Sequence, residues 1–406
     1  MVDDFVELRA QAGQVFTPGS PVNEQELFSG RVEQLQRIVD AVNQKGYHAA
    51  LYGERGVGKT SLANILTAIS KAQTVITSKT ICDASDDYAT LWRKAFSEIT
   101  YSRLKQGFGF NAEQEAEITT LADMLRQDAR PEDVRRIIAS IGTSARILFV
   151  FDEFDRVSDR HAAVLMSDTI KSFSDYGLNA TILVIGVASS VETLLEGHNS
   201  IERAVVQIPM PRMSGAEISQ IVANGMTRLG LQIEDTAKDD IQQLSQGLPY
   251  ITHLLALHSC QRALEREDKL VRYEDIRVGI QRSLDQWQHS VRKAYSDATQ
   301  SAQPGNIYKQ VLLSCALAEA DEMGFFAAAA LRRPLKLITS RDYDIPNYAQ
   351  HLKNFTDDTR GPILEMVGST RRRRYRFISP LHRPYITIRG VSEGMITPDQ
   401  IRELSA

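Results

Sequence analysis

The segment Gly53-Glu54-Arg55-Gly56-Val57-Gly58-Lys59-Thr60 constrains the fold of this 406-residue chain more than any other feature of its sequence. It fits the pattern G-x-x-x-x-G-K-S/T, it follows the short apolar run 48–52, and a helical pattern begins at Lys59. Glycines in this setting let the backbone curl around an anion, and the amides at the helix start point at that anion. We therefore expect a phosphate-binding loop in which Lys59 reaches the β- and γ-phosphates and Thr60 binds Mg²⁺. The expected cofactor-binding residues here are Gly53, Glu54, Arg55, Gly56, Val57, Gly58, Lys59, Thr60 and Ser61.

A second motif follows the apolar run 146–151, where Asp152 and Glu153 stand side by side. In a parallel sheet, a carboxylate pair at the C-terminal end of a strand lies beside the phosphate loop. Asp152 is therefore expected to hold the Mg²⁺ shell, and Glu153 to polarise the attacking water. A solvated acidic loop is the alternative, because Asp155 and Asp159 follow, but the preceding apolar run argues against it.

Short apolar runs alternate with helical patterns through the first half of the chain. Runs at 75–78, 146–151, 181–187 and 204–208 are typical of strands buried on both sides, and their alternation with helices predicts an α/β fold with a parallel sheet sandwiched by helices. The predicted organisation is an irregular N-terminal arm (1–22), an α/β nucleotide-binding domain (23–212), a helical lid with a connecting helix (213–300), a winged-helix domain (301–392) and a tail (393–406).

The winged-helix prediction depends on the order of elements after residue 306. Helical segments near 307–320 and 346–356 precede two strands, 363–367 and 375–378, joined by a turn that contains Arg371, Arg372, Arg373 and Arg374. Guanidinium groups at such a tip can grip the phosphate backbone of duplex DNA. The second helix offers groups for base edges. These are Asn347, Gln350, His351, Lys353 and Asn354.

An alternative is that the basic hairpin docks onto the acidic body of the same chain. Residues 301–406 hold 15 Lys and Arg against 11 Asp and Glu, which leaves 32 against 40 in residues 1–300 out of the totals of 47 and 51. The two parts therefore carry net charges of opposite sign.

Together the two motifs resemble the Walker A and Walker B motifs of the AAA+ superfamily, and more narrowly the ATPases near the initiator (origin-recognition) proteins and the STAND signalling ATPases. The resemblance covers about residues 15–300 and implies ATP and Mg²⁺ as cofactors. Segment 27–31 resembles the F-x-G-R entry of these ATPases, which implies that Phe28, Gly30 and Arg31 lie near the adenine. Segment 247–250 resembles the GxP of STAND relatives, which implies that Pro249 lies near the base.

Two further segments imply catalytic roles. Segment 184–189 resembles the strand that carries sensor 1, here Ser189, with Ser190 as the alternative. Segment 200–203 resembles the arginine-finger segment, so Arg203 would act from a neighbouring subunit and the active form would be a homo-oligomer. A surface arginine paired with Glu202 or Glu217 is the alternative.

One departure from the family pattern concerns sensor 2. The lid helix begins at 249–253 without the arginine that many AAA+ proteins carry there, and His253 stands nearby. This departure favours slow hydrolysis or a nucleotide-held switch.

Two functions remain open at this point. One is an ATP-hydrolysing protein that couples nucleotide state to oligomer assembly and duplex DNA binding; the other is a STAND-like switch acting on a protein partner that serves as effector or sensor. A small-molecule P-loop enzyme fits less well, because it would not need a winged helix. Three isolated cysteines, no apolar run long enough for a bilayer and no signal peptide lead us to expect a cytoplasmic protein without a membrane partner.

Overall fold

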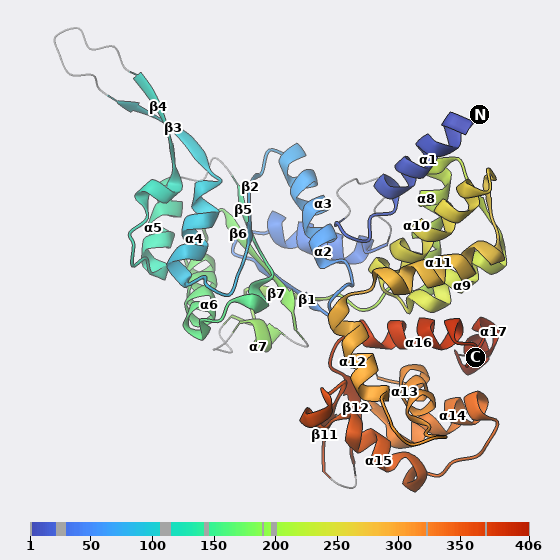
Figure 1. The fold of residues 1–406 in the computed structure, drawn as a ribbon. Coiled ribbons are helices and arrows are strands. Elements are labelled where there is room, and N and C mark those ends of the chain that lie inside the picture. Colours follow the sequence, from blue (N-terminus) through green and yellow to red (C-terminus); the bar gives the residue numbers. More distant parts are fainter. Residues whose placement is uncertain are drawn as a thin grey trace, which may run out of the picture.

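The computed structural model describes residues 2–21, 30–105, 115–141, 146–188, 191–195, 201–321, 324–369 and 372–405. Three regions follow one another along the chain (Figure 1): a sheet domain, a helical lid and a C-terminal region that lies beneath the lid in this view. A notch between the sheet domain and the lid contains the phosphate loop.

Five parallel strands form the sheet, in the order β2-β5-β6-β1-β7. Every residue of β5 is buried, and β6 is buried up to its last residue, which explains their uninterrupted apolar sequences. The four strands expected from apolar runs and the one before the phosphate loop are confirmed to within a few residues. Their bounds are β1 His48–Gly53, β2 Ile76–Ile81, β5 Ile147–Asp152, β6 Ala180–Val187 and β7 Val205–Pro209.

Helices cover both faces of this sheet. Alternate residues of β5 point to opposite sides: Leu148 and Val150 pack with α2 and α3, whereas Phe149 and Phe151 pack with α4, α5 and α6. The second face is rich in aromatic residues, with Trp92 of α4 at its centre. The helices span α2 Val32–Asn43, α3 Lys59–Ala72, α4 Tyr88–Ser97, α5 Pro131–Ile141 and α6 Arg160–Asp175.

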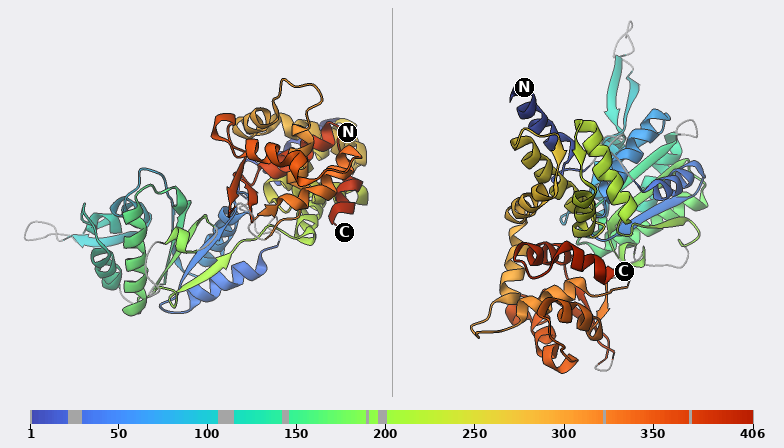
Figure 2. Two further views of the ribbon diagram at one scale, coloured as in Figure 1. Left: turned by 90° about the horizontal axis from the view of Figure 1, so that it is seen from below. Right: turned by 90° about the vertical axis from the view of Figure 1, so that its right-hand side faces the viewer.

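A two-stranded ribbon projects from the sheet domain, away from the lid and the C-terminal region (Figures 1 and 2). Its strands, β3 Thr100–Lys105 and β4 Glu115–Thr120, pair antiparallel between α4 and α5. The sequence analysis did not predict this ribbon, because its alternation of apolar and polar residues is short and mixed.

The lid is helical and includes the N-terminal helix α1, Val2–Val15. The prediction that the first twenty or so residues are irregular was therefore wrong for most of them. Ala12, Val15 and Phe16 are buried against α8 and α10, so tertiary packing stabilises this helix. A Cβ on Gly225 of α8 would collide with the ring of Phe16. The lid helices are α8 Gly215–Leu229, α9 Asp235–Ser245, α10 Pro249–Glu265 and α11 Tyr273–Gln286.

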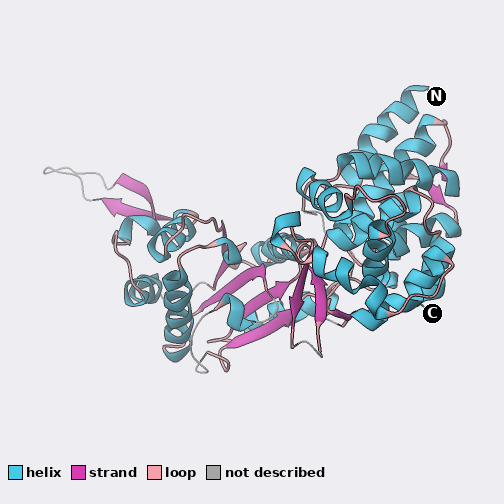
Figure 3. Ribbon diagram, turned by 60° about the horizontal axis from the view of Figure 1, so that its bottom comes forward, coloured by secondary structure: helices cyan, strands magenta, loops and turns pink. Residues whose placement is uncertain are grey.

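The C-terminal region combines helices with a three-stranded antiparallel sheet of order β10-β12-β11 (Figure 3). The region between the two predicted helices contains β10 and α14. The tail forms α17. The elements are α12 His289–Thr299, α13 Tyr308–Leu317, β10 Phe326–Ala327, α14 Arg332–Thr339, α15 Ile345–Phe355, β11 Leu364–Val367, β12 Arg374–Phe377, α16 His382–Ser392 and α17 Pro398–Ser405.

Helix α16 joins the C-terminal region to the lid. Thr387 Oγ1 accepts a hydrogen bond of 2.8 Å from Gln246 Nε2 at the end of α9, and Tyr385 packs edge-on against Trp287. An ion pair of 3.1 Å between Arg402 of α17 and Asp240 of α9 adds a second attachment. One continuous hydrophobic cluster runs through all three regions. Within the described residues, no helix is both long enough and apolar enough to cross a lipid bilayer.

Candidate nucleotide site

The phosphate loop connects β1 to α3 at the edge of the notch. A Cβ at Gly53 would collide with the carbonyl oxygen of Met210, and Gly58 adopts a φ of 95° as the N-cap of α3. Both positions therefore require glycine for steric or conformational reasons. Val57 is buried beneath the loop and anchors it to the core, whereas Arg55 is exposed at the mouth of the pocket.

Lys59 lies at the centre of this loop, and its side chain closes the loop on itself. Its Nζ donates hydrogen bonds of 2.9 Å and 2.8 Å to the carbonyl oxygens of Gly53 and Glu54. Burial lowers the pKa of Lys59 to about 8, while the carboxylates of Asp155 and Asp152 act in the opposite direction. A cation placed in this way can exchange the loop carbonyls for phosphate oxygens.

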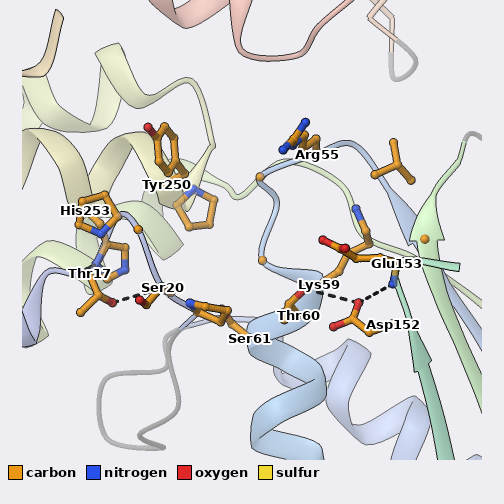
Figure 4. A pocket seen from close by; sticks show the side chains of 18 of the residues that line it. Thr17, Ser20, Arg55, Lys59, Thr60, Ser61, Asp152, Glu153, Tyr250 and His253 are labelled. Atoms are coloured by element: carbon orange, nitrogen blue, oxygen red, sulfur yellow. Dashed lines mark hydrogen bonds between the residues drawn. The ribbon is translucent and has the colours of Figure 1, made fainter. Parts of the chain in front are cut away.

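Thr60 and Asp152 bring two oxygen atoms together beside the loop (Figure 4). The hydroxyl of Thr60, at the start of α3, lies 3.4 Å from Oδ1 of Asp152, at the end of β5. The same Oδ1 accepts a hydrogen bond of 3.0 Å from the amide of Glu153. A hydroxyl and a carboxylate are hard oxygen ligands, so this pair fits Mg²⁺, which keeps several waters and takes few protein ligands.

Glu153 turns its carboxylate away from the core. Its backbone is left-handed, with a φ of 58°, and its Oε2 accepts a hydrogen bond of 2.6 Å from Arg156. Asp155, which sequence analysis left as part of an acidic loop, also lines the pocket, where its Oδ1 accepts a 2.8 Å hydrogen bond from the amide of Val187. This bond joins the segment after β5 to the end of β6.

The far side of the pocket is formed by the first turn of α10 and by an N-terminal segment that the sequence analysis did not include. The segment Thr17-Pro18-Gly19-Ser20-Pro21 faces Pro249, Tyr250 and His253 of α10, at a distance in sequence that no local pattern reveals. Thr17 N donates a 3.2 Å hydrogen bond to Nδ1 of His253, and burial lowers the pKa of this histidine to about 4. His253 is thus neutral at pH 7 and protonated on Nε2. Pro249 lines the pocket, where the GxP resemblance places it.

Several predicted residues lie elsewhere. Gly30 and Arg31 stand beside Glu217 of α8 rather than among the residues that line the pocket: Arg31 N donates to Glu217 Oε1, and its guanidinium donates to Pro211 O. Arg203 is exposed just before β7 and outside the pocket lining, and Glu217 is occupied by Arg31 and Ser214. Phe28, Ser189 and its alternative Ser190 lie outside the described residues.

The phosphate loop also touches the other two regions. Glu54 forms an ion pair of 2.8 Å with Arg212, which lies between β7 and α8. Leu381, at the start of α16, lies so close to the loop that a Cβ on Gly56 would come within 3.9 Å of its Cδ2. Residues far apart in the sequence thus brace both sides of the loop.

The arginines of the β11–β12 turn differ from one another in their surroundings. Arg372, Arg373 and Arg374 are exposed, and Arg371 lies outside the described residues. Arg374 pairs with Asp321 and packs over Phe325. Arg376, on the next outward position of β12, pairs with Glu365 at 2.6 Å.

Four of the five α15 side chains considered for base contacts interact with other residues of the region. Asn347 Oδ1 caps its own helix by accepting from Asp344 N, Asn354 Nδ2 donates to the hydroxyl of Tyr308, and His351 packs against the ring of Tyr308. Gln350 and Lys353 are exposed, with Gln350 donating to Asn354.

Comparisons with known proteins give one family match and several distant structural ones. The family model described as novel STAND NTPase 1 matches residues 21–354. Solved structures with a similar fold include the ORC1 protein of Aeropyrum pernix in complex with DNA (16% identity, 92% of this chain and 95% of that chain covered, TM-score 0.47). A second is a Walker-type ATPase of Pyrococcus abyssi (14% identity, 92% of this chain and 99% of that chain covered, TM-score 0.49). A third is the RuvB Holliday junction branch migration motor of Thermotoga maritima (14% identity, 87% of this chain and 94% of that chain covered, TM-score 0.42). No curated protein matches the chain.

Proposed function

This chain belongs to the novel STAND NTPase 1 family, and from that premise we propose that it is a nucleotide-held switch. It binds ATP with Mg²⁺, hydrolyses the ATP, and keeps its C-terminal region docked on the phosphate loop in the closed state. One observation carries this proposal: Leu381, in the segment that begins α16, lies within van der Waals reach of the position that a Cβ on Gly56 would occupy, and α16 itself is bonded to the lid through Thr387.

The residues of the pocket have separate roles in this proposal. Lys59 neutralises charge on the β- and γ-phosphates, and the amides of the loop and of the α3 N-terminus bind the phosphate oxygens. Thr60 and Asp152 hold Mg²⁺, which supplies charge neutralisation at the phosphates when bound. Glu153 orients and polarises the attacking water once its carboxylate is released from Arg156. Pro249, Tyr250 and the segment 17–21 form the walls that receive the base and ribose.

The docked C-terminal region makes release of nucleotide and rearrangement interdependent. Helix α16 touches both the loop and the lid, so opening the pocket requires α16 to shift or the lid to move with it. We propose that the open state assembles into a homo-oligomer, in which Arg203 of one subunit reaches the site of the next. A protein partner would act as the trigger or effector.

The test of this switch is a variant that loosens the contact without touching the nucleotide. Leu381→Ala removes the apolar group beside Gly56 and is expected to accelerate release of a fluorescent ADP analogue and to raise the oligomeric fraction in the presence of ATP. Ile378→Ala is the matched control, because Ile378 lies on the same segment but is 50% exposed. Equal release rates and equal particle mass for both variants and the wild type would count against the switch.

Duplex DNA is the second candidate partner, and the exposure of Arg372 and Arg373 favours it. We interpret the order α13, β10, α14, α15, β11, β12 as a winged helix, in which α15 would take the recognition position and the arginines the tip of the wing. Such a tip would bind phosphates and contribute affinity rather than sequence specificity.

A further inference from the structure

Lys79 of β2 lies beside the proposed magnesium site, although it belongs to neither nucleotide motif. Strand β2 pairs with β5 so that Ile81 is the register partner of Asp152, and Lys79 stands two residues earlier on the same face of the sheet. Its Nζ lies 3.3 Å from Asp152 Oδ2 and also donates to Asn64 Oδ1 on α3. The ammonium group is therefore held from two sides.

The two oxygens of Asp152 face different groups. Oδ1 lies toward Thr60 and the amide of Glu153, on the side where Mg²⁺ fits, whereas Oδ2 faces Lys79. The side chain of Asp152 is only 3% exposed and that of Lys79 is 19% exposed, so water screens this ion pair weakly. A buried carboxylate without a partner would be strongly destabilising, and Lys79 supplies that partner before any metal arrives.

We propose that Lys79 is the built-in counter-ion of the magnesium site, which stabilises Asp152 in the metal-free protein and lowers the affinity of the site for Mg²⁺. The proposal rests on the nucleotide binding proposed above. Its physical basis is that a fixed positive charge next to a ligand oxygen repels a second cation. Mg²⁺ then binds effectively only together with the phosphates, whose negative charge outweighs Lys79.

This arrangement gives Lys79 a positioning role rather than a catalytic one. It touches Asp152 and Asn64, and it is not among the residues that line the pocket. By holding Oδ2, it fixes the rotation of the carboxylate so that Oδ1 points at Thr60. A lysine that served stability alone would leave the metal affinity of the nucleotide complex unchanged, which separates the two roles.

The experiment measures the Mg²⁺ concentration that half-saturates the fluorescence change of a ribose-labelled ATP analogue bound to the full-length protein. Lys79→Met removes the charge at nearly constant length and is expected to lower this concentration about tenfold, because Mg²⁺ no longer competes with a nearby ammonium group. Lys79→Arg keeps the charge and should stay close to the wild type. The matched control is Lys94→Met, which breaks ion pairs of 2.7 Å with Asp83 and Asp86 and leaves the ion pair of Asp152 intact.

A second measurement uses no nucleotide. Thermal unfolding is measured with and without Mg²⁺ at about 10 mM, a concentration that suffices for weak carboxylate sites. The stabilisation by the metal should be larger for Lys79→Met than for the wild type. Lys79→Gln retains a hydrogen-bond donor for Asn64 and should behave like Lys79→Met, which guards against loss of folding in the methionine variant.

The outcomes distinguish this inference from the function on which it rests. A wild-type protein that fails to bind the ATP analogue would refute the proposed function. Normal analogue binding by both uncharged variants, with the Mg²⁺ dependence of the wild type, would overturn the counter-ion role of Lys79. A decrease of the same size in the half-saturating Mg²⁺ concentration of Lys94→Met would overturn it too, because the effect would then reflect net charge alone.

Discussion

The nucleotide pocket and the arginine-bearing turn of the C-terminal region were both predicted from short sequence motifs that contain charged residues, but the charges have different surroundings in the structure. In the pocket, Lys59 and Thr60 at the start of α3 and Asp152 at the end of β5 converge on one space. In the turn, Arg374 is neutralised by Asp321, and the neighbouring Arg376 by Glu365. A motif that specifies backbone conformation together with charge predicts a site, whereas a run of like charges predicts only a composition that neighbouring groups can neutralise.

The largest expected effect is a loss of ATP hydrolysis in a variant that still binds ATP. Glu153→Gln should lower ATP turnover by about 10²–10⁴-fold, because an amide cannot polarise water as a carboxylate does. Affinity for ATP should stay within a few-fold of the wild type, since Glu153 does not lie at the loop. Single-turnover hydrolysis with labelled ATP measures this.

The control for that variant is Arg156→Gln, which removes the partner of Glu153 in an ion pair where both side chains are about half exposed. Exposed pairs of this kind contribute little stability, so this variant should remain folded and active. Wild-type turnover in Glu153→Gln would assign the water-orienting role to another group, with Asp155 as the next candidate because it also lines the pocket.

Arg203 tests whether the pocket is complete within one chain. Arg203→Ala should reduce turnover by about 10³-fold if the guanidinium stabilises transition-state charge from a neighbouring subunit. Mixing this variant with Glu153→Gln should restore part of the activity, because one kind of mixed interface carries both intact groups. A monomer that hydrolyses ATP fully at every concentration would contradict the assignment.

Lys59→Ala tests the charge at the centre of the loop through stability rather than rate. ATP with Mg²⁺ at 100 times its Kd should stabilise the wild type by about 2.7 kcal/mol, and the variant should lose most of this gain. Lys71→Ala is the control, because Lys71 lies on the same helix and is exposed. Differential scanning fluorimetry with and without ATP gives both numbers. An undiminished shift in Lys59→Ala would remove the basis for the phosphate loop.

The lid beside the nucleotide pocket and the C-terminal region each contain a buried histidine. The pH dependence of unfolding therefore allows the two to be compared. Burial lowers the pKa of His253 and of His382 to about 4. Folding therefore favours the neutral form of each histidine. The resulting contribution to the free energy of unfolding is fully present above about pH 6.5 and is lost as the pH falls toward 4. Each should contribute about 2 kcal/mol less at pH 5 than at pH 7.

Urea unfolding at the two pH values checks this, with His253→Gln and His382→Gln each expected to flatten the dependence. If ATP binds where we propose, it should reduce the acid sensitivity caused by His253, beside the pocket, more than that caused by His382. An acid response that neither substitution alters would place its origin in other groups.

The smallest effect concerns the turn. If it binds duplex DNA, Arg372→Glu with Arg373→Glu should weaken binding about tenfold at 0.1 M salt and flatten the slope of log affinity against log salt by about two. The control reverses the same amount of charge on the sheet domain, at the exposed Lys71 and Arg160. Absence of duplex binding by the wild type at low salt would leave the protein-partner switch as the remaining candidate.

Whether a part of the fold or of the site could be predicted from the sequence depends on how far apart in the chain the interacting residues lie. Buried strands and the phosphate loop depend on local apolar runs and glycine conformations, so β1, β2, β5, β6 and β7 and the loop were predicted. Asp152 and Glu153 were placed by the rule that strand ends meet at one edge of a parallel sheet.

Residues brought together only by tertiary packing could not be predicted. Helix α1 has a weakly patterned sequence and is stabilised by burying Phe16 against Gly225. The wall formed by Thr17 and His253 joins positions 236 residues apart. Nothing in the sequence distinguishes Lys79 from other charged residues on strands. Only the pairing register of β2 with β5 places it beside Asp152.

The double attachment of α16, to the loop through Leu381 and to the lid through Thr387, has a thermodynamic consequence. Suppose that a partner binds only when α16 is detached, and that bound ATP weakens this partner's affinity by some factor. Linkage then requires the partner to weaken ATP binding by the same factor. A partner that discriminates tenfold between nucleotide-bound and nucleotide-free protein therefore necessarily lowers the affinity of the protein for ATP tenfold, and a single pair of equilibrium titrations would reveal both effects.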